Sequence, residues 1–510
     1  MKRPNFANRY EASCGAAFAL CTLLIGACAS NPTTPAMPSE AQAIINSAQY
    51  AHGSWSWDAV ELGSGKMLFA SNENKLNFLG STTKLFTVGT YYEEFGADST
   101  LETPVYATGT RSGGTLTGDL VLVGSGDFIL GGRGVLDGQL QYTEPDHVYA
   151  YAVPTVKPVA ANPLAGLDRL AAEVTAAGIT SINGDVLVND KLWNPFTTKE
   201  GVVTSIMVND NLLDILINPG ASMGDPVKMS TIPSTQFFTV DNHATTAAAG
   251  GQSTLTATLQ PDNRVVIAGR LPLGAPQQDL AQFAPNPAAY ARALFIEALR
   301  RAGVTVDTPL QASTGTLPPD SDYTAANKVA SLTSPPTSIL TRLVTKISDN
   351  RGAETLLCLL AKKAGSRDCD SGGMPVVISK FAKANIEPGT VNIYDGEGSD
   401  PASATPAAMT RWLGYIHAQS FAAVFKAGLP DIDHDGKIMV KSGLSARPEM
   451  GPMPAMFVAA GQAGYMTTAS GKDAVVAVYA LNGTYRTVSE GLDEDLPNTE
   501  KVLNQMQRVS

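Results

Sequence analysis

Three short polar motifs lie far apart in this chain, and their spacing limits how it can fold. Ser81 and Lys84 form the only S-x-x-K, residues 348–350 form one of two S-x-N, and residues 441–443 form the only K-[ST]-G. The first interval, from Lys84 to residue 348, is 348 − 84 = 264 positions, and the second is 441 − 350 = 91. The second interval suits one compact domain, whereas the first is far too long for a loop. The sequence therefore predicts one domain that is interrupted by an insertion and resumes near residue 327.

Ser81 is the candidate nucleophile of the first motif. The apolar residues from Leu85 to Tyr91 predict a buried helix that begins near this serine. A serine at a helix start lies among free N–H groups at the positive end of the helix dipole, which favours an alkoxide. Lys84 lies on the same face, three positions later, where burial would lower its pKa. The pair predicts a nucleophilic serine with a lysine as its base.

A chain of 510 residues is expected to form two or three domains. The stretch between the first two motifs is rich in Thr, Gly, Val and Leu, with repeated strand-like runs. We predict a signal segment, a tether, a divided catalytic domain, a divided inserted domain and a nested β-rich domain. Their bounds are 1–27 for the signal, 28–40 for the tether, 41–100 and 327–510 for the catalytic domain, 101–210 and 287–326 for the inserted domain, and 211–286 for the nested domain.

The N-terminus predicts export. Lys2, Arg3 and Arg9 precede a short apolar segment, Ala16 to Ile25, which is too short to span a membrane stably. This segment runs into Ile-Gly-Ala-Cys, which resembles a bacterial lipobox in which Cys28 becomes the lipidated first residue. Plain signal peptidase cleavage after a small residue is the alternative. Residues 31–40 are rich in Pro, Thr and Ser and are typical of a tether.

Beyond Cys28 the chain has only two cysteines, Cys358 and Cys369. An exported protein with one such pair is expected to join the two in a disulfide, with two free thiols as the alternative. His434 lies among acidic residues, and a solvated loop explains this segment better than a metal site, because no second ligand cluster accompanies it. We therefore predict neither a metal nor another cofactor. The net charge of −11 argues against nucleic acid as a partner.

S-x-x-K, S-D-N and K-T-G together are the signature of penicillin-binding proteins and class A β-lactamases, and this chain has the first two with K-S-G in place of the third. The order and spacing here resemble the class C low-molecular-mass penicillin-binding proteins of the D-alanyl-D-alanine carboxypeptidase/endopeptidase family, peptidase family S13. Segments 124–127, 184–190 and 208–211 add to the resemblance. The chain departs from the family pattern at Ser442, where K-T-G has threonine, and within 395–401, where the family has D-G-S-G-L-S-R.

The resemblance implies an α/β (α+β) fold, namely a β-lactamase/transpeptidase-like catalytic domain interrupted by inserted β-rich domains. Its antiparallel sheet would carry helices on both faces. In family terms Ser81 attacks the carbonyl between two D-alanines and Lys84 accepts its proton. Ser348 and Lys441 would pass a proton to the leaving D-alanine, and Asn350 would hold the substrate amide.

We expect three residues to bind the substrate: Ser442 and Gly443 of the last motif, and Leu444 directly after it. Ser442 would bind the terminal carboxylate beside Gly443, and the N–H of Leu444 would complete an oxyanion hole with that of Ser81. The expected partners are peptidoglycan, β-lactam antibiotics and, through a lipid anchor, a membrane. The expected location is the periplasm, at the outer membrane. The alternatives are a β-lactamase-like hydrolase on the same fold and a non-catalytic wall-binding lipoprotein.

Overall fold

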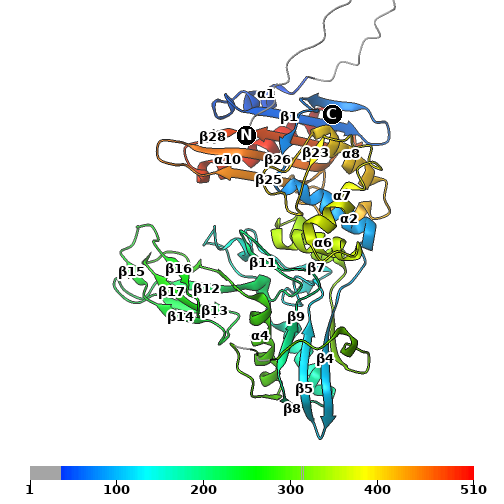
Figure 1. Cartoon of the computed structure of the whole chain (residues 1–510). Helices are drawn as coiled ribbons and strands as arrows, with labels where there is room; N and C mark the ends of the chain where they lie inside the picture. Colours follow the sequence, from blue (N-terminus) through cyan, green and yellow to red (C-terminus); the bar gives the residue numbers. More distant parts are fainter. Residues whose placement is uncertain (1–35, 312, 314) are drawn as a thin grey trace, which may run out of the picture.

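The main sheet joins the two ends of the chain. The computed structural model describes residues 36–510 except 312 and 314, so the predicted signal segment and Cys28 lie outside the described residues. Five strands run in the order β2-β1-β27-β26-β25, all antiparallel, and β28 pairs with β26. The N-terminal hairpin thus pairs with C-terminal strands (Figure 1). The strands are β1 (Ser54–Glu61), β2 (Met67–Ser71), β25 (Ile438–Arg447), β26 (Ala455–Thr467), β27 (Asp473–Leu481) and β28 (Gly483–Tyr485).

Helices cover both faces of this sheet, because apolar side chains alternate between the faces along its strands. On β27, Val476 and Val478 pack in one buried cluster with residues of α10. Val475 and Tyr479 belong to the opposite cluster, with residues of α2 and α8. This layered arrangement is the one predicted for the catalytic domain. The covering helices are α1 (Ser39–Ile45) and α10 (Val488–Val509) on one face, and α2 (Lys84–Phe95) and α8 (Pro406–His417) on the other.

A helical layer packs against α2 and carries the second motif. The second motif lies at the corner between α5 and α6, where the Asp349 side chain caps α6 by accepting the N–H of Gly352 at 3.1 Å. A disulfide between Cys358 and Cys369 joins α6 to α7. The helices of this layer are α5 (Thr337–Thr345), α6 (Asn350–Lys363), α7 (Cys369–Ile378) and α9 (Ala422–Ala427).

A second six-stranded sheet fills the inserted part, in the order β21-β8-β5-β4-β22 with β9 beside β5. One predicted boundary needs correction: β22 pairs with β4, so the chain returns to the catalytic part after residue 333 and not near 327. Helices α3 (Ala165–Ala176) and α4 (Pro287–Arg301) pack with this sheet. Its strands are β4 (Glu102–Ser112), β5 (Thr115–Val123), β8 (Ser181–Asn183), β9 (Val186–Asn189), β21 (Thr305–Val306) and β22 (Lys328–Thr333).

Small sheets within residues 212–283 form the outer lobe of the insert (Figure 1). The longest of their strands, β12, pairs with β13 on one side and with β19 and β20 on the other. These strands are β12 (Leu212–Asn218), β13 (Lys228–Ile232), β14 (Thr239–Asn242), β15 (Thr245–Ala247), β16 (Thr256–Leu259), β17 (Arg264–Ala268), β18 (Arg270–Pro272), β19 (Gln278–Asp279) and β20 (Gln282–Phe283). Within residues 36–510, no helix is long and apolar enough to cross a membrane.

Candidate active site

Ser81 and Lys84 lie where a 3₁₀ turn leads into α2. The turn, η2, covers Gly80–Thr83, so the α-helix begins at Lys84, slightly later than the sequence predicts. Lys84 is fully buried, and its Nζ lies 2.6 Å from Ser81 Oγ. The two side chains of the first motif are therefore in direct contact.

Among the residues that the structure describes, Lys84 Nζ has only uncharged oxygens at hydrogen-bond distance. Besides Ser81 Oγ, its Nζ donates to Asn350 Oδ1 at 2.6 Å and to the carbonyl of Glu397 at 3.1 Å. A neutral amine keeps two donors and one lone pair. With Asn350 and Glu397 taking the two donors, the lone pair of a neutral Lys84 points to the Ser81 hydroxyl. This geometry suits a base that removes the hydroxyl proton.

Burial favours that neutral form. Desolvation lowers the pKa of Lys84, while the carboxylates of Glu397 and Glu200 oppose the shift. The net pKa is below the usual value for lysine. A base is most useful when its pKa approaches the working pH, so this shift serves proton transfer.

A residue of the inserted part of the chain, Glu200, fixes the side chain of Asn350. Its Nδ2 donates to Glu200 Oε1 at 2.6 Å, and the Tyr151 hydroxyl donates to the same oxygen at 3.0 Å. Glu200 lies in the turn between β10 (Phe196–Thr198) and β11 (Gly201–Val203) and is 4 % exposed. Asn350 therefore orients Lys84 with one end of its amide and is itself fixed by Glu200 at the other.

Ser348 stands in a backbone conformation that few non-glycine residues adopt. Its φ is 66°, in the left-handed region. The hydroxyl of Tyr149 donates to the carbonyl of Ser348 at 2.8 Å. Such strained conformations persist only where the surroundings hold them, and here the insert supplies part of that support.

The third motif lies on the edge strand β25, which packs directly on η2. A Cβ on Gly443 would come within 2.0 Å of the Leu79 carbonyl, so only glycine allows this approach. The same packing brings the N–H of Leu444 beside Gly80. Lys441 is buried, and its Nζ donates to the Ser442 carbonyl at 2.8 Å.

Lys441 has no carboxylate hydrogen-bonded to it in the described part of the chain. Burial and the neighbouring charge of Lys84 hold the pKa of Lys441 well below its usual value. The hydroxyls of Ser348 and Ser442 form no hydrogen bond to another predicted site residue within the described ranges. The structure thus brings Ser81, Lys84 and Asn350 into contact and leaves these two hydroxyls free.

A protein-family profile identifies the family to which this chain belongs. The profile of the D-Ala-D-Ala carboxypeptidase 3 (S13) family matches residues 44–501. The chain belongs to the S13 family. This match confirms the resemblance drawn from the three motifs, and it places the chain in a family of serine-type D-Ala-D-Ala carboxypeptidases.

Two known proteins illustrate the S13 relationship. A D-alanyl-D-alanine carboxypeptidase of Actinomadura sp. (strain R39) is 24% identical over 391 residues, which are 73% of this chain and 66% of the relative. The alignment thus spans slightly less than two thirds of that relative's length. The crystal structure of penicillin binding protein 4 from Haemophilus influenzae matches with a TM-score of 0.67 at 17% identity, covering 92% of this chain and 99% of the other. This likeness confirms the predicted fold class.

One loop near Lys84 departs from the S13 pattern in a way that adds a charge. The family's D-G-S-G becomes Asp395-Gly396-Glu397-Gly398 here, and Glu397 is 7 % exposed. Burial raises the pKa of Glu397, whereas the charge of Lys84 opposes the rise. The sequence marks this departure, but it does not show that the carboxylate lies beside the base.

Three carboxylates form the group in residues 36–510 that could hold a metal ion: Glu354, Asp395 and Glu397 have oxygens within 4.8 Å of one another. However, Glu354 accepts the N–H groups of Gly396 and Glu397 at 2.9 Å, and Asp395 accepts that of Gly398 at 2.7 Å. Burial, followed by the neighbouring carboxylates, raises the pKa of Glu354 well above its usual value. We therefore assign these side chains to shaping the loop that carries Glu397.

A buried charge network lies in the insert. The Arg133 guanidinium donates to both oxygens of Asp146, at 2.9 and 2.8 Å, and to Asp210 at 3.0 Å. The two ring nitrogens of His147 lie 2.9 Å from carboxylate oxygens of Asp210 and Asp214. Every cation here thus has a carboxylate in contact.

The network reaches the second motif through the backbone, because Arg351 of α6 donates to the carbonyl of Asp210. Burial alone would lower the pKa of His147, but the Asp214 and Asp210 carboxylates raise it to about 10. Sequence reasoning missed Tyr149, Glu200 and this network, because no local pattern links them to the three motifs.

Proposed function

We propose that this protein is a serine DD-peptidase that acts on peptidoglycan stem peptides through an acyl-enzyme on Ser81. It would work as a D-Ala-D-Ala carboxypeptidase, an endopeptidase or both. The observation that carries the proposal is the contact of Lys84 Nζ with Ser81 Oγ and Asn350 Oδ1, each at 2.6 Å. Membership of the S13 family and the β-lactam complex of the Haemophilus influenzae protein support the same reaction class.

In the first step, Ser81 Oγ attacks the carbonyl carbon between two D-alanines while its proton moves to Lys84 Nζ. The N–H groups of Ser81 and Leu444 stabilise the oxyanion that forms. The close packing of β25 on η2 at Gly443 supports this pairing. The C–N bond then breaks, and the proton that Lys84 took from Ser81 reaches the leaving amine by way of Lys441 and Ser348, which leaves Lys84 neutral again.

In the second step, water attacks the acyl carbonyl, and Lys84 again accepts a proton. The released Ser81 oxygen takes a proton back, which restores the resting state. The substrate's terminal carboxylate binds Ser442, and the neighbouring Lys441 adds positive charge when protonated. A β-lactam presents a similar acyl group and acylates the same serine.

Mass spectrometry of the intact protein after benzylpenicillin tests the nucleophile. We expect a single penicilloyl adduct on Ser81 in the wild type and none in Ser81→Ala. An adduct that survives in Ser81→Ala would disprove the assignment. Release of D-alanine from a pentapeptide and cleavage of a crosslinked dimer, measured side by side, would then separate carboxypeptidase from endopeptidase activity.

We also propose that the protein is held in the periplasm by a lipid on Cys28, on the evidence of the lipobox-like segment alone. Labelling with a fatty acid analogue in a bacterial host should mark the wild type and not Cys28→Ser. A wild-type protein that is recovered unlabelled and with a free Cys28 would refute the anchor.

A further inference from the structure

One loop of the catalytic part places a buried carboxylate, that of Glu397, beside the base lysine. The backbone of this loop packs directly on the turn that carries the nucleophile, since a Cβ added to Gly398 would come within 2.0 Å of the Gly80 carbonyl. The Glu397 carbonyl accepts a hydrogen bond from Lys84 Nζ at 3.1 Å, and that nitrogen lies 2.6 Å from Ser81 Oγ. Two hydrogen bonds therefore connect the backbone of Glu397 to the nucleophile.

The side chain of Glu397 also belongs to the site, because it is buried and not turned into solvent. Of the charged groups near Lys84, the Glu397 carboxylate has the largest effect on the lysine, and Lys84 has the largest effect on Glu397. Such effects weaken with distance, so the two side chains lie close together. Glu200 and Lys199 are the next charges that act on this carboxylate. Burial raises the pKa of Glu397 toward the range in which a carboxyl group exchanges protons readily.

The two oxygens of the Glu397 carboxylate have different surroundings. Oε1 accepts a hydrogen bond from the Ser399 hydroxyl at 3.0 Å, which orients the group. Oε2 accepts no hydrogen bond within the described ranges, and yet it is not fully enclosed by protein atoms. A water molecule can therefore reach Oε2 and donate to it, as the attacking water must do if this carboxylate is its base.

Both members of this hydrogen bond depart from the S13 pattern. The family's D-G-S-G-L-S-R has a serine at the position of Glu397 and a leucine at that of Ser399. The two changes together introduce a carboxylate and the hydroxyl that orients it. Class A β-lactamases, which share the S-x-x-K and S-D-N motifs, use a glutamate that acts through a water to hydrolyse their acyl-enzyme. The two departures thus supply the type of group that this hydrolysis uses.

We propose that Glu397 is a further catalytic residue, which takes the proton of the water that hydrolyses the acyl-enzyme; this inference rests on the proposed function. As the water oxygen bonds to the acyl carbon, one of its O–H bonds breaks and the proton goes to Glu397 Oε2. That proton passes to Lys84 and then to the Ser81 oxygen, as the ester C–O bond breaks and the acid product leaves. All three side chains return to their starting states. A β-lactam acyl group leaves by the same route, so the chain hydrolyses penicillin and does not stay acylated.

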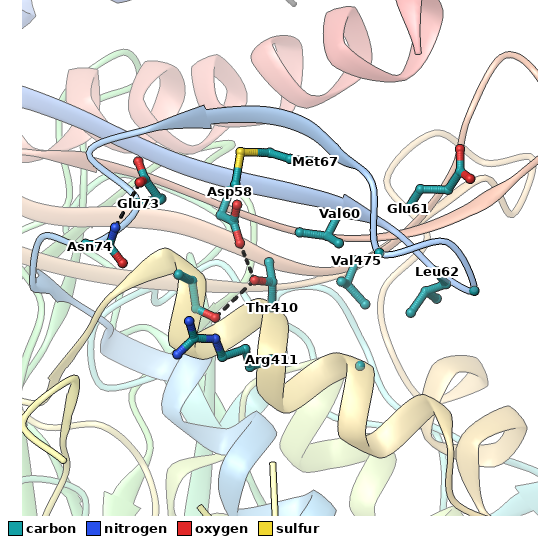
Figure 2. Close-up of a pocket in the computed structure, with 14 residues that line it drawn as sticks. Asp58, Val60, Glu61, Leu62, Met67, Glu73, Asn74, Thr410, Arg411 and Val475 are labelled. Atoms are coloured by element: carbon teal, nitrogen blue, oxygen red, sulfur yellow. Dashed lines mark hydrogen bonds between the residues drawn. The ribbon is translucent and has the colours of Figure 1, made fainter. Parts of the chain in front are cut away.

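The lifetime of the penicilloyl adduct tests this role. The protein is acylated with benzylpenicillin, the excess is removed, and the intact mass is followed over time. Glu397→Gln keeps the size of the side chain but cannot take the proton, so its adduct should persist about 10²-fold longer than that of the wild type. Glu397→Ser, with the family residue, should retain its adduct in the same way. The matched control is Glu73→Gln, at the cavity under the first hairpin, which none of the candidate catalytic residues lines (Figure 2), and it should leave the lifetime unchanged.

Hydroxylamine separates a lost base from a damaged site. It is a neutral nucleophile stronger than water, so it should release the adduct from Glu397→Gln and from the wild type at similar rates. An adduct on Glu397→Gln that decays as fast as that of the wild type, or one that resists hydroxylamine, would overturn the role of Glu397 and leave the acyl-enzyme in place. If no adduct formed on Ser81 in either the wild type or Glu397→Gln, the proposed function would fall together with this inference.

Discussion

Two regions of this molecule bury cations, and they treat them in opposite ways. In the catalytic part, Lys84 donates to a hydroxyl, an amide oxygen and a backbone carbonyl, all of them uncharged. In the insert, both ring nitrogens of His147 lie 2.9 Å from carboxylates. The pKa of Lys84 is lowered and that of His147 is raised to about 10, although burial acts in the same direction on both.

The difference lies in the groups that touch the cation. Burial removes water from either side chain and penalises its charged form. A carboxylate in direct contact more than offsets that penalty for His147, whereas for Lys84 the carboxylates act from beyond its hydrogen bonds. The carboxylates around His147 keep that side chain charged and serve structure. The uncharged neighbours of Lys84 leave its proton exchangeable and serve catalysis. Changing either set of neighbours tests this distinction.

The largest effect is expected at the base itself. Lys84→Ala should slow acylation by benzylpenicillin and by peptide by about 10²–10⁴-fold, because no group remains to accept the Ser81 proton. Lys84→Arg keeps the positive charge but cannot lose its proton, so it should be similarly slow. Stopped-flow acylation rates measure both variants. Normal acylation by Lys84→Arg would show that charge, and not proton transfer, is what the site needs.

Breaking the insert network should affect stability more than chemistry. Arg133→Met leaves Asp146 buried without its hydrogen-bonded cation and leaves Asp210 with His147 alone, which should cost about 3–5 kcal/mol of unfolding free energy. Urea unfolding followed by tryptophan fluorescence measures the loss. The matched control is Arg169→Met, at the exposed pair with Glu173, which should change stability by less than about 0.5 kcal/mol. Equal stability of the two variants would remove the structural role assigned to the network.

The carboxylate-binding end of the site should be less sensitive than the base. Ser442→Ala removes one hydrogen bond to a charged group, worth about 1.5–3 kcal/mol, which is about 10- to 100-fold in kcat/KM. Ser442→Thr restores the family residue and should leave kcat/KM nearly unchanged. D-Ala release assays rank the variants. If Ser442→Ala were as inactive as Lys84→Ala, the separation of roles would be wrong.

Glu200 connects the two regions, since it lies in the insert and fixes Asn350. Glu200→Gln keeps an acceptor oxygen and loses the charge, so it should cost about 1 kcal/mol, or about five-fold in kcat/KM. Glu200→Ala should cost more, because the Asn350 amide loses its partner. Acylation rates of both variants give the comparison. A greater loss in Gln than in Ala would contradict a positioning role.

The smallest effect concerns pH. The carboxylate of Glu397 raises the pKa of Lys84, so Glu397→Gln should lower that pKa further. The lysine then stays neutral to lower pH, and the acid limb of the kcat/KM profile should move to lower pH. Glu494→Gln, on the helix covering the other face of the sheet, should leave the profile in place. A shift to higher pH would mean that another group controls the acid limb.

The sequence by itself determined the chemistry that is local to each motif. Ser81 and Lys84 are three positions apart, and helical geometry alone places them together, as the 2.6 Å contact bears out. The long interval after Lys84 predicted an interrupted domain. These inferences could be drawn because they depend on the period of one element or on distance along the chain.

Only the tertiary structure decided which distant residues surround the base. Asn350 contacts Lys84 across 266 positions, and Glu200 reaches Asn350 from a turn of the insert. The return of the chain after residue 333 likewise depends on the pairing of β22 with β4. Such contacts are fixed by the packing of separate segments and leave no periodic trace in the sequence. The sequence therefore identified Lys84 as the candidate base, whereas the packing of distant segments around Lys84 determines its pKa.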